Sequence, residues 1–253
     1  MGDKTRLARH IVYASKATKV AKASRFGIVA SAILTFLIFA ISYYGQLVGN
    51  FTFTIERMAQ GVGITMYESF EEKNYTSILR TTRVDNADGM TSLCGTEYSI
   101  FQPGDGVCIP PDEELASVDG TNNGKSYMVY TYYVENVGDN IVDLVGRVNV
   151  ISESKGAIES IRVRVIINGE GVTYARRQTA LGITPGDPEP LTTPFFSVTQ
   201  VMNHTIEEFR PGQFIKVTVV IWYEGEDPDH NNSILGGGVK LDMSFTISKI
   251  YEL

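Results

Sequence analysis

One stretch of the chain constrains its organisation more than any other. The segment from Phe26 to Val48 reads FGIVASAILTFLIFAISYYGQLV and contains neither a charged residue nor a proline. A helix needs roughly 20 apolar residues to cross the hydrocarbon core of a bilayer, and tyrosines such as Tyr43 and Tyr44 favour its interface with water. The sequence therefore predicts one transmembrane helix over residues 26–48.

The distribution of charge predicts how this helix is oriented. Residues 1–25 hold seven basic residues and one acidic residue, whereas the chain after residue 48 holds 15 basic and 28 acidic residues. Because basic flanks stay in the cytoplasm, we expect a cell-membrane protein with a cytoplasmic N-terminus and an extracytoplasmic domain over residues 49–253. A cleaved signal peptide is the alternative, since Ala40-Ile41-Ser42 fits a signal-peptidase site. The long leader and the long apolar stretch favour an uncleaved anchor.

The basic leader, residues 1–25, repeats its apolar residues at helical spacing and is predicted to form an amphipathic helix. Its last four basic residues precede the apolar segment: Lys16, Lys19, Lys22 and Arg25. A base near the membrane surface gains about 1 kcal/mol from anionic lipid, so the bilayer and its anionic lipids are the expected partners. Alternatively, these bases only fix the topology. No nucleic-acid partner is expected, because no aromatic residues are interleaved with the bases.

The chain after residue 51 changes to an alternation with period two, which is typical of strands. Apolar residues alternate with polar ones over 239–247 and over 160–167, and the latter ends at Asn168-Gly169, a pair that favours a tight hairpin turn. Further strands are predicted at 52–56, 62–67, 77–83, 127–135, 141–151, 172–176 and 214–223. The segments 127–135 and 214–223 are apolar or aromatic throughout, as central strands are.

This pattern predicts an all-β domain: a single antiparallel β-sandwich, immunoglobulin-like or jelly-roll in topology, preceded by the transmembrane helix. The Gly-, Asn- and Asp-rich region 85–125 is expected to be a decorated insertion, and residues 185–190 a surface loop. The tyrosines of 127–133 invite an alternative role in stacking on a ligand, but cross-strand packing is the simpler interpretation.

The two cysteines, Cys94 and Cys108, both follow the predicted span. A pair in an oxidising compartment is expected to form a disulfide, and this spacing matches no zinc-binding motif. We therefore predict a Cys94–Cys108 disulfide within the insertion.

An acidic turn follows the strand at 214–223. Carboxylates at near-alternate positions of a loop can supply the oxygen ligands that calcium prefers, so calcium is the one cofactor that the sequence suggests. The candidate ligands are Glu224, Glu226, Asp227 and Asp229. The alternative is a solvated acidic turn. Residues 85–89 form a weaker candidate of the same kind.

A longer stretch around this turn carries a family resemblance. Phe209-Arg210-Pro211-Gly212 is followed by KVTVVIWYEGEDPD, residues 216–229. This resembles uncharacterised membrane-anchored exported proteins of low-GC Gram-positive bacteria, which are distantly similar to the camelysin/TasA-type biofilm-fibre proteins. The resemblance covers residues 126–250 and implies a surface or matrix protein that associates with copies of itself. The long basic leader and the predicted anchor depart from the fibre-forming pattern, and no metal-ligand motif of a protease can be matched.

No arrangement of residues typical of catalysis is found in the sequence. His204 and His230 are the only histidines after the apolar segment, both expected in surface loops, and the H-E-x-x-H, G-x-S-x-G and phosphate-binding motifs are absent. We therefore expect a non-enzymatic, single-pass cell-surface protein for adhesion, self-association or scaffolding, with copies of itself or other surface proteins as partners. The alternatives are an extracytoplasmic ligand- or calcium-binding subunit of a larger membrane complex and, less favoured, a tethered hydrolase.

Overall fold

The computed structural model describes residues 25–39, 51–179 and 185–251. The chain divides into two compact units, residues 1–49 and 50–253. In the first unit, residues 25–39 form a helix whose large apolar side chains are exposed. Within the described ranges, no helix combines the length and apolarity needed to cross a membrane. The predicted span continues beyond this helix, and its end lies outside the described residues, as do Lys16, Lys19 and Lys22.

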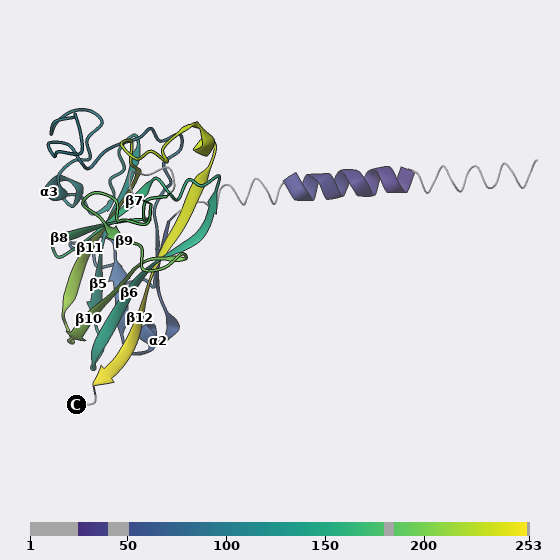
Figure 1. Ribbon diagram of the computed structural model, residues 1–253. Helices are drawn as coiled ribbons and strands as arrows, with labels where there is room; N and C mark the ends of the chain where they lie inside the picture. The colour runs from purple at the N-terminus through teal and green to yellow at the C-terminus, as the bar shows by residue number, and fades with distance from the viewer. Residues whose placement is uncertain (1–24, 40–50, 180–184, 252–253) are drawn as a thin grey trace, which may run out of the picture. The chain divides into compact units, whose positions relative to one another are not determined.

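The second unit is built from two mixed β-sheets (Figure 1). The five-stranded sheet has the order β10 (Gln200–Phe209), β6 (Ile141–Ser154), β12 (Gly238–Tyr251), β1 (Thr52–Ile55) and β3 (Ile78–Arg80). The seven-stranded sheet has the order β2 (Ile64–Tyr67), β5 (Tyr127–Asn136), β11 (Phe214–Tyr223), β7 (Ile161–Ile167), β8 (Glu170–Ala175) and β9 (Thr193–Pro194), with β4 (Gly120–Thr121) also paired to β5. Three short helices are α2 (Arg57–Gly61), α3 (Asp112–Leu115) and the 3-10 turn η1 (Asn232–Ile234).

The prediction of purely antiparallel sheets was wrong. Strand β1 pairs in parallel with β12, and β8 pairs in parallel with β9. Strands β1 and β12 lie at opposite ends of the domain sequence, and β8 and β9 are joined by the long connection 176–192. Parallel strands need a long connection of this kind. The period-two pattern identifies a strand but carries no information about the direction of its neighbour.

The two sheets share one hydrophobic core, in which aromatic residues join them. Phe53 of β1 has its ring centroid 4.8 Å from that of Tyr130 and 4.5 Å from that of Tyr132, both on β5 of the other sheet. The hydroxyl of Tyr132 donates a hydrogen bond to the sulfur of Met243 on β12, 3.1 Å away. Tyr130 and Tyr132 are therefore packing residues, in keeping with the simpler interpretation of this segment.

Every predicted strand is present, and the predicted hairpin turn is confirmed. Asn168 and Gly169 connect β7 to β8 with φ values of 51° and 90°, and both residue types tolerate this left-handed conformation. Strand β10 was not predicted. Its pairing with β6 shifts register between Gln200 and Met202 and again between Ile206 and Phe209, so bulges interrupt the alternation that identifies a strand.

The region 85–125 covers the outer face of the seven-stranded sheet. Met90 and Leu115 pack on Trp222 of β11 in a second hydrophobic cluster. Helix α3 is held to β7 by Asp112, whose two carboxylate oxygens accept hydrogen bonds of 2.7 and 2.6 Å from Arg164. This explains why β5 and β11 are apolar on both faces: one face meets the other sheet, and part of the other face meets these loops.

The predicted disulfide between Cys94 and Cys108 is confirmed. It closes a loop with a sequence separation of 14 in a region without long strands. Replacing both cysteines by serine is expected to lower the free energy of unfolding by about 3 kcal/mol, because the unfolded chain regains the entropy of the open loop. Urea denaturation of the oxidised protein and of the double variant measures the difference. Equal stabilities would contradict this contribution of the disulfide to the fold.

Candidate functional site

A buried ion cluster lies where the acidic turn after β11 meets β7. Arg162 of β7 is 3% exposed, and its Nη2 atom donates a 2.8 Å hydrogen bond to Oδ2 of Asp227. The same nitrogen lies 3.4 Å from Oε2 of Glu189. Both carboxylates are buried. One guanidinium therefore faces two acidic groups that are largely withdrawn from water.

The four predicted calcium ligands lie close together in sequence, but their oxygens have different protein partners. Glu224 is buried and accepts hydrogen bonds from the indole nitrogen of Trp222, at 3.2 Å, and from the backbone and hydroxyl of Ser92. Glu226 accepts from the hydroxyl of Ser99 at 2.9 Å. Asp229 accepts from the hydroxyl of Thr179 at 2.9 Å, and Asp227 pairs with Arg162 as described. These hydrogen bonds connect the acidic turn to the loops that contain Ser92, Ser99 and Thr179.

A cavity of about 110 Å³ adjoins this cluster. Its charged lining residues are Arg162, Glu189, Glu224, Glu226 and Asp227. Among the residues that the structure describes, no group of three or more His, Cys, Asp or Glu side chains is placed to hold a metal ion. Calcium binding at the acidic turn stays an untested hypothesis. Arg162 is the cation that lies against Asp227 and Glu189.

The calcium hypothesis has a direct test. Because each candidate carboxylate already accepts a hydrogen bond from the protein, we expect millimolar calcium to leave the melting temperature of the full chain unchanged. A ligand that binds only the native state raises the melting temperature in proportion to the logarithm of its concentration. A calcium-dependent rise that Glu226→Gln abolishes would reverse this expectation and establish a site.

Glu189 is a member of this cluster that the sequence did not reveal. It lies in the loop 185–190, which was expected to be exposed, yet it is buried against Arg162. Burial, followed by the negative charge of Asp227, raises the pKa of Glu189 to about 7, and the positive charge of Arg162 opposes this rise. No local pattern marks such a residue, because its burial depends on a loop and a strand that are distant in sequence.

The raised pKa of Glu189 predicts a specific pH dependence. The folded protein holds this proton up to a pH near 7, whereas the unfolded chain releases it near pH 4.5. The contribution of Glu189 to the stability of the fold is therefore largest below pH 4.5. It is lost as the pH rises towards and through 7. Glu189→Gln is expected to remove this contribution and to exceed the wild type in melting temperature at pH 8. Parallel melting curves of the two proteins between pH 5 and 8 would contradict the assignment.

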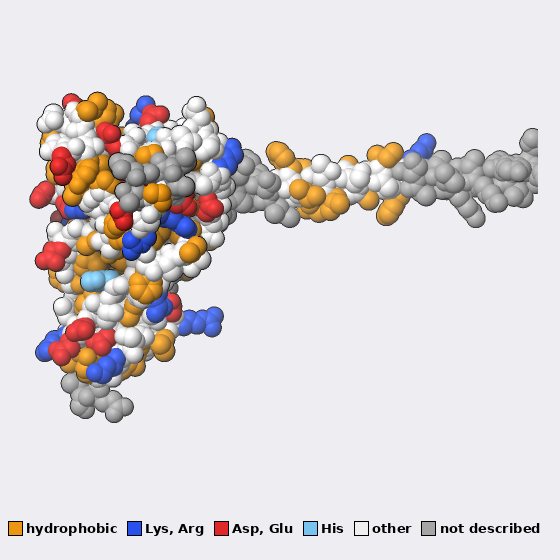
Figure 2. All heavy atoms as spheres, in the orientation of Figure 1, with side chains coloured by type: hydrophobic (Ala, Val, Ile, Leu, Met, Phe, Trp, Pro, Cys, Tyr) orange, Lys and Arg blue, Asp and Glu red, His pale blue; other side chains and the backbone are white. Residues whose placement is uncertain are grey.

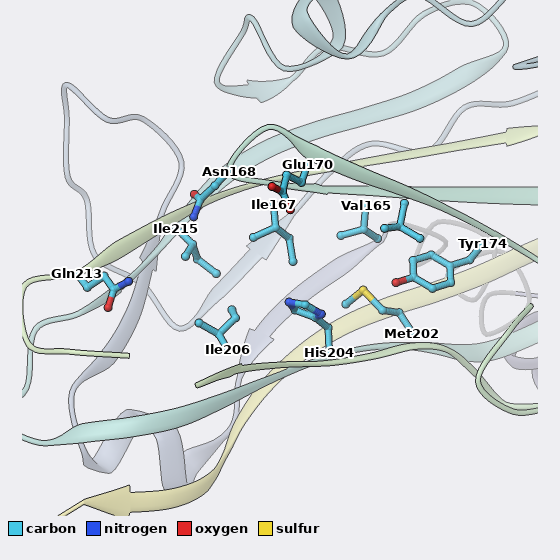
Figure 3. Close-up of a pocket in the computed structure, with 11 residues that line it drawn as sticks. Val165, Ile167, Asn168, Glu170, Tyr174, Met202, His204, Ile206, Gln213 and Ile215 are labelled. Carbon is cyan, nitrogen blue, oxygen red and sulfur yellow. The ribbon is translucent and has the colours of Figure 1, made fainter. Parts of the chain in front are cut away.

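A second candidate site is a groove between the two sheets, on the side where β8 faces β10 (Figure 3). Met202, His204 and Ile206 of β10 point across it towards Ile167 of β7 and Tyr174 of β8. Its volume is about 400 Å³. The remaining lining residues are Val165, Asn168, Glu170, Val172, Gln213 and Ile215. The groove is thus mainly apolar, with an imidazole and a carboxylate among its few polar groups.

His204 lies on a strand rather than in the surface loop that the sequence suggested. It lies between Met202 and Ile206 on the groove side of β10, and it is exposed to solvent, as are Asn203 and Thr205. The period-two spacing of Met202, His204 and Ile206 is the one signal that would have located this strand. His230, by contrast, lies in the loop after the acidic turn and stacks on Tyr223, with 6.2 Å between the ring centroids.

Comparison with known proteins yields no family. No family model matches the chain, and no curated protein matches it. Among solved structures, the chain is similar to a β-glucosidase from Kluyveromyces marxianus in complex with glucose, with 11% identity and a TM-score of 0.27. The match covers 74% of this chain and 16% of the β-glucosidase, so the chain spans about a sixth of its length. A similarity at this level carries no argument about fold or activity.

Proposed function

We propose that this chain is a single-pass membrane protein that displays a β-sandwich, immunoglobulin-like or jelly-roll in type, outside the cell. Its role is non-enzymatic: it binds further copies of itself or other surface proteins. Support for the anchor comes from the uncharged segment 26–48 and from the basic residues that precede it. The Cys94–Cys108 disulfide supports an oxidising compartment for the folded domain.

The observation that carries the binding role is the open side of the domain between β8 and β10. Beyond the bridge between Ser197 and Gln200, the outer edge of β10 pairs with no strand among the described residues. An unpaired edge presents backbone donors and acceptors to a partner. The apolar groove beside it, lined by Met202 and Ile206, provides surface that a partner would bury. The edge of β10 and the adjacent groove therefore offer a partner both backbone hydrogen bonds and apolar contacts.

The face of the domain shown in Figure 2 bears a mixture of side-chain types. Acidic, basic and hydrophobic side chains are interspersed over the face shown in Figure 2, without a large field of one sign. Exposed hydrophobic residues scattered singly are ordinary on a folded domain. The groove is distinguished from them because its apolar residues come from both sheets and enclose a volume.

Site-specific photocrosslinking in intact cells tests the proposal. A photoreactive amino acid at Val172, which is 41% exposed and lines the groove, is expected to give discrete adducts with a second copy or with a surface protein. The matched control is Ile151 of β6, which is 50% exposed and does not line the groove. Equal adduct patterns at both positions, or none at either, would contradict a partner at the groove.

A second candidate function is favoured by the size of the same groove. About 400 Å³ lies within the range of small-molecule pockets, and a mainly apolar lining with a few polar groups is typical of them. The chain would then be the ligand-binding part of a larger membrane complex. Native mass spectrometry of the full chain, released from membranes in mild detergent, distinguishes the two roles. A small molecule retained by the wild type and lost from Met202→Trp would favour this second function.

A further inference from the structure

A group of aromatic side chains lies on the outer face of the seven-stranded sheet, away from the groove and the ion cluster. In the strand register, Tyr67 of β2 is opposite Tyr133 of β5, and Phe214 of β11 is opposite Glu135 of β5. Side chains two residues apart on a strand share a face, so all four lie on the same side of the sheet. The positions of these four residues are therefore fixed by strands β2, β5 and β11.

A loop completes this group. Phe70, from the segment 68–77 between β2 and β3, has its ring centroid 5.4 Å from that of Tyr133 and 5.2 Å from that of Phe214. The rings of Tyr67 and Tyr133 stack at 5.2 Å with an angle of 12° between their planes. The result is a continuous aromatic wall beside the carboxylate of Glu135.

The space inside this wall holds a cation, the ammonium group of Lys73. Its Nζ atom lies 5.2 Å from the ring centroid of Tyr67, 5.5 Å from that of Phe70 and 5.9 Å from that of Phe214. It also forms a 2.9 Å ion pair with Oε2 of Glu135, which raises the pKa of Lys73. We call Tyr67, Phe70, Phe214 and Glu135 the aromatic cage.

The cage and its present occupant differ in how firmly they are held. Glu135 has a side chain that is 10% exposed and lies on β5, which pairs at this residue with β11 on one side and β2 on the other. The side chain of Lys73 is 37% exposed. Both neighbours of Lys73, Glu72 and Asn74, are exposed. The side chain of Lys73 can therefore rotate out into solvent, while the rings and the carboxylate of the cage remain in place.

The dimensions and charge of the cage indicate which ligand replaces Lys73. Ring faces attract cations within about 6 Å, and recognition of quaternary ammonium groups is the best-known use of such cages. An N–C bond of about 1.5 Å allows methyl groups to fill the gap between a central nitrogen and rings 5.2–5.9 Å away. Burial and the charge of Glu135 raise the pKa of Tyr67 to about 12, so its ring is neutral. The carboxylate of Glu135, 2.9 Å from the present ammonium group, supplies a countercharge.

We propose that the aromatic cage is a binding site for a trimethylammonium group and that Lys73 occupies it until the ligand displaces it. The ligand class is the choline-like head group, either free or part of a lipid. This activity goes beyond display of the domain and does not depend on the groove between β8 and β10. Its consequence is that ligand binding frees the side chain of Lys73 from its ion pair with Glu135, while Phe70 stays in the cage.

The first test reads the release of Lys73 in the unmodified full chain. Limited acetylation followed by peptide mass spectrometry measures the reactivity of each lysine, with and without choline chloride. Choline is expected to increase acetylation of Lys73 severalfold and to leave Lys125 and Lys240 unchanged. Two controls are matched: 3,3-dimethyl-1-butanol, which has the shape of choline without its charge, and sodium chloride at equal ionic strength. Uniform reactivity of Lys73 in all three solutions would overturn the proposal.

The second test removes the internal competitor. Lys73→Ala is expected to bind choline severalfold more tightly than the wild type in calorimetric titration. Adding Phe70→Ala to it is expected to weaken binding about fivefold, the equivalent of ~1 kcal/mol for one ring. Phe70 is 45% exposed, so its removal does not threaten the fold. If Lys73→Ala keeps the wild-type melting temperature and binds no choline, the cage is not a ligand site.

Nanodiscs distinguish the two sources of the ligand. Increased acetylation of Lys73 in phosphatidylcholine discs, compared with phosphatidylglycerol discs, identifies a lipid head group. If only free choline increases the reactivity, the ligand is a soluble compound. Both results support a trimethylammonium site, and no response to either source contradicts it. Failure of crosslinking at Val172 would affect the proposed display function alone.

Discussion

Arg162→Ala is expected to lower the free energy of unfolding by about 3–5 kcal/mol, because it leaves Asp227 and Glu189 buried without their cation. Asp227 lies 2.8 Å from the guanidinium, and its side chain has no exposed area. Urea denaturation at pH 7 measures the loss. The effect should shrink at pH 5, because Glu189, whose pKa is raised to about 7, is then protonated.

Arg164 provides the matched control for this variant. It lies two residues further along β7 and pairs with Asp112, but both of these side chains are about one-quarter exposed. Solvent screens such a pair, so Arg164→Ala is expected to cost about 1 kcal/mol. Comparable losses at Arg162 and Arg164 would show that burial of the cluster adds nothing, contrary to this account.

Trp222→Ala is expected to have a similarly large effect, about 3–5 kcal/mol, since it empties the centre of the second hydrophobic cluster. Trp222 is 2% exposed and packs with Met90 and Leu115 of the region 85–125. It also donates the hydrogen bond that satisfies the buried Glu224. Its loss therefore loosens the loops as well as the sheet, and hydrogen exchange is expected to increase across residues 85–125.

A second substitution separates packing from hydrogen bonding at this position. Trp222→Phe keeps an aromatic ring but removes the indole nitrogen, so it should retain most of the packing and leave Glu224 with the donors of Ser92 and the backbone of Glu226. We expect a smaller loss, of about 1–3 kcal/mol. Unchanged exchange rates in residues 85–125 for Trp222→Ala would contradict the role assigned to the cluster.

Local sequence patterns were sufficient where a structural feature depends on neighbouring residues. The Asn168-Gly169 turn is an example, because the dipeptide itself tolerates the backbone that the hairpin needs. The alternation over 239–247 likewise identified β12. Strand β10 was missed because two bulges break its alternation. The parallel pairing of β1 with β12 joins segments nearly the whole domain apart, and no local pattern encodes it.

The candidate sites show the same limit. The acidic turn was recognised as a cluster, but its partner Arg162 was read as part of an ordinary polar strand face. Whether that face meets water depends on loops that fold over it from 85–125 and 185–190. Glu189 was placed on the surface for the same reason. Burial of a polar residue is a property of the assembled domain, so sequence identifies the residue types of a site better than their partners.

The central claim is that the domain is displayed from an intact membrane anchor, and one measurement tests it most directly. Intact-mass spectrometry compares the chain in washed membranes of the producing cells with the chain in the culture medium. The account predicts the full mass of residues 1–253 in the membrane fraction, with little protein in the medium. A chain that begins near Tyr43 and is found mainly in the medium would contradict the anchor and establish a secreted protein.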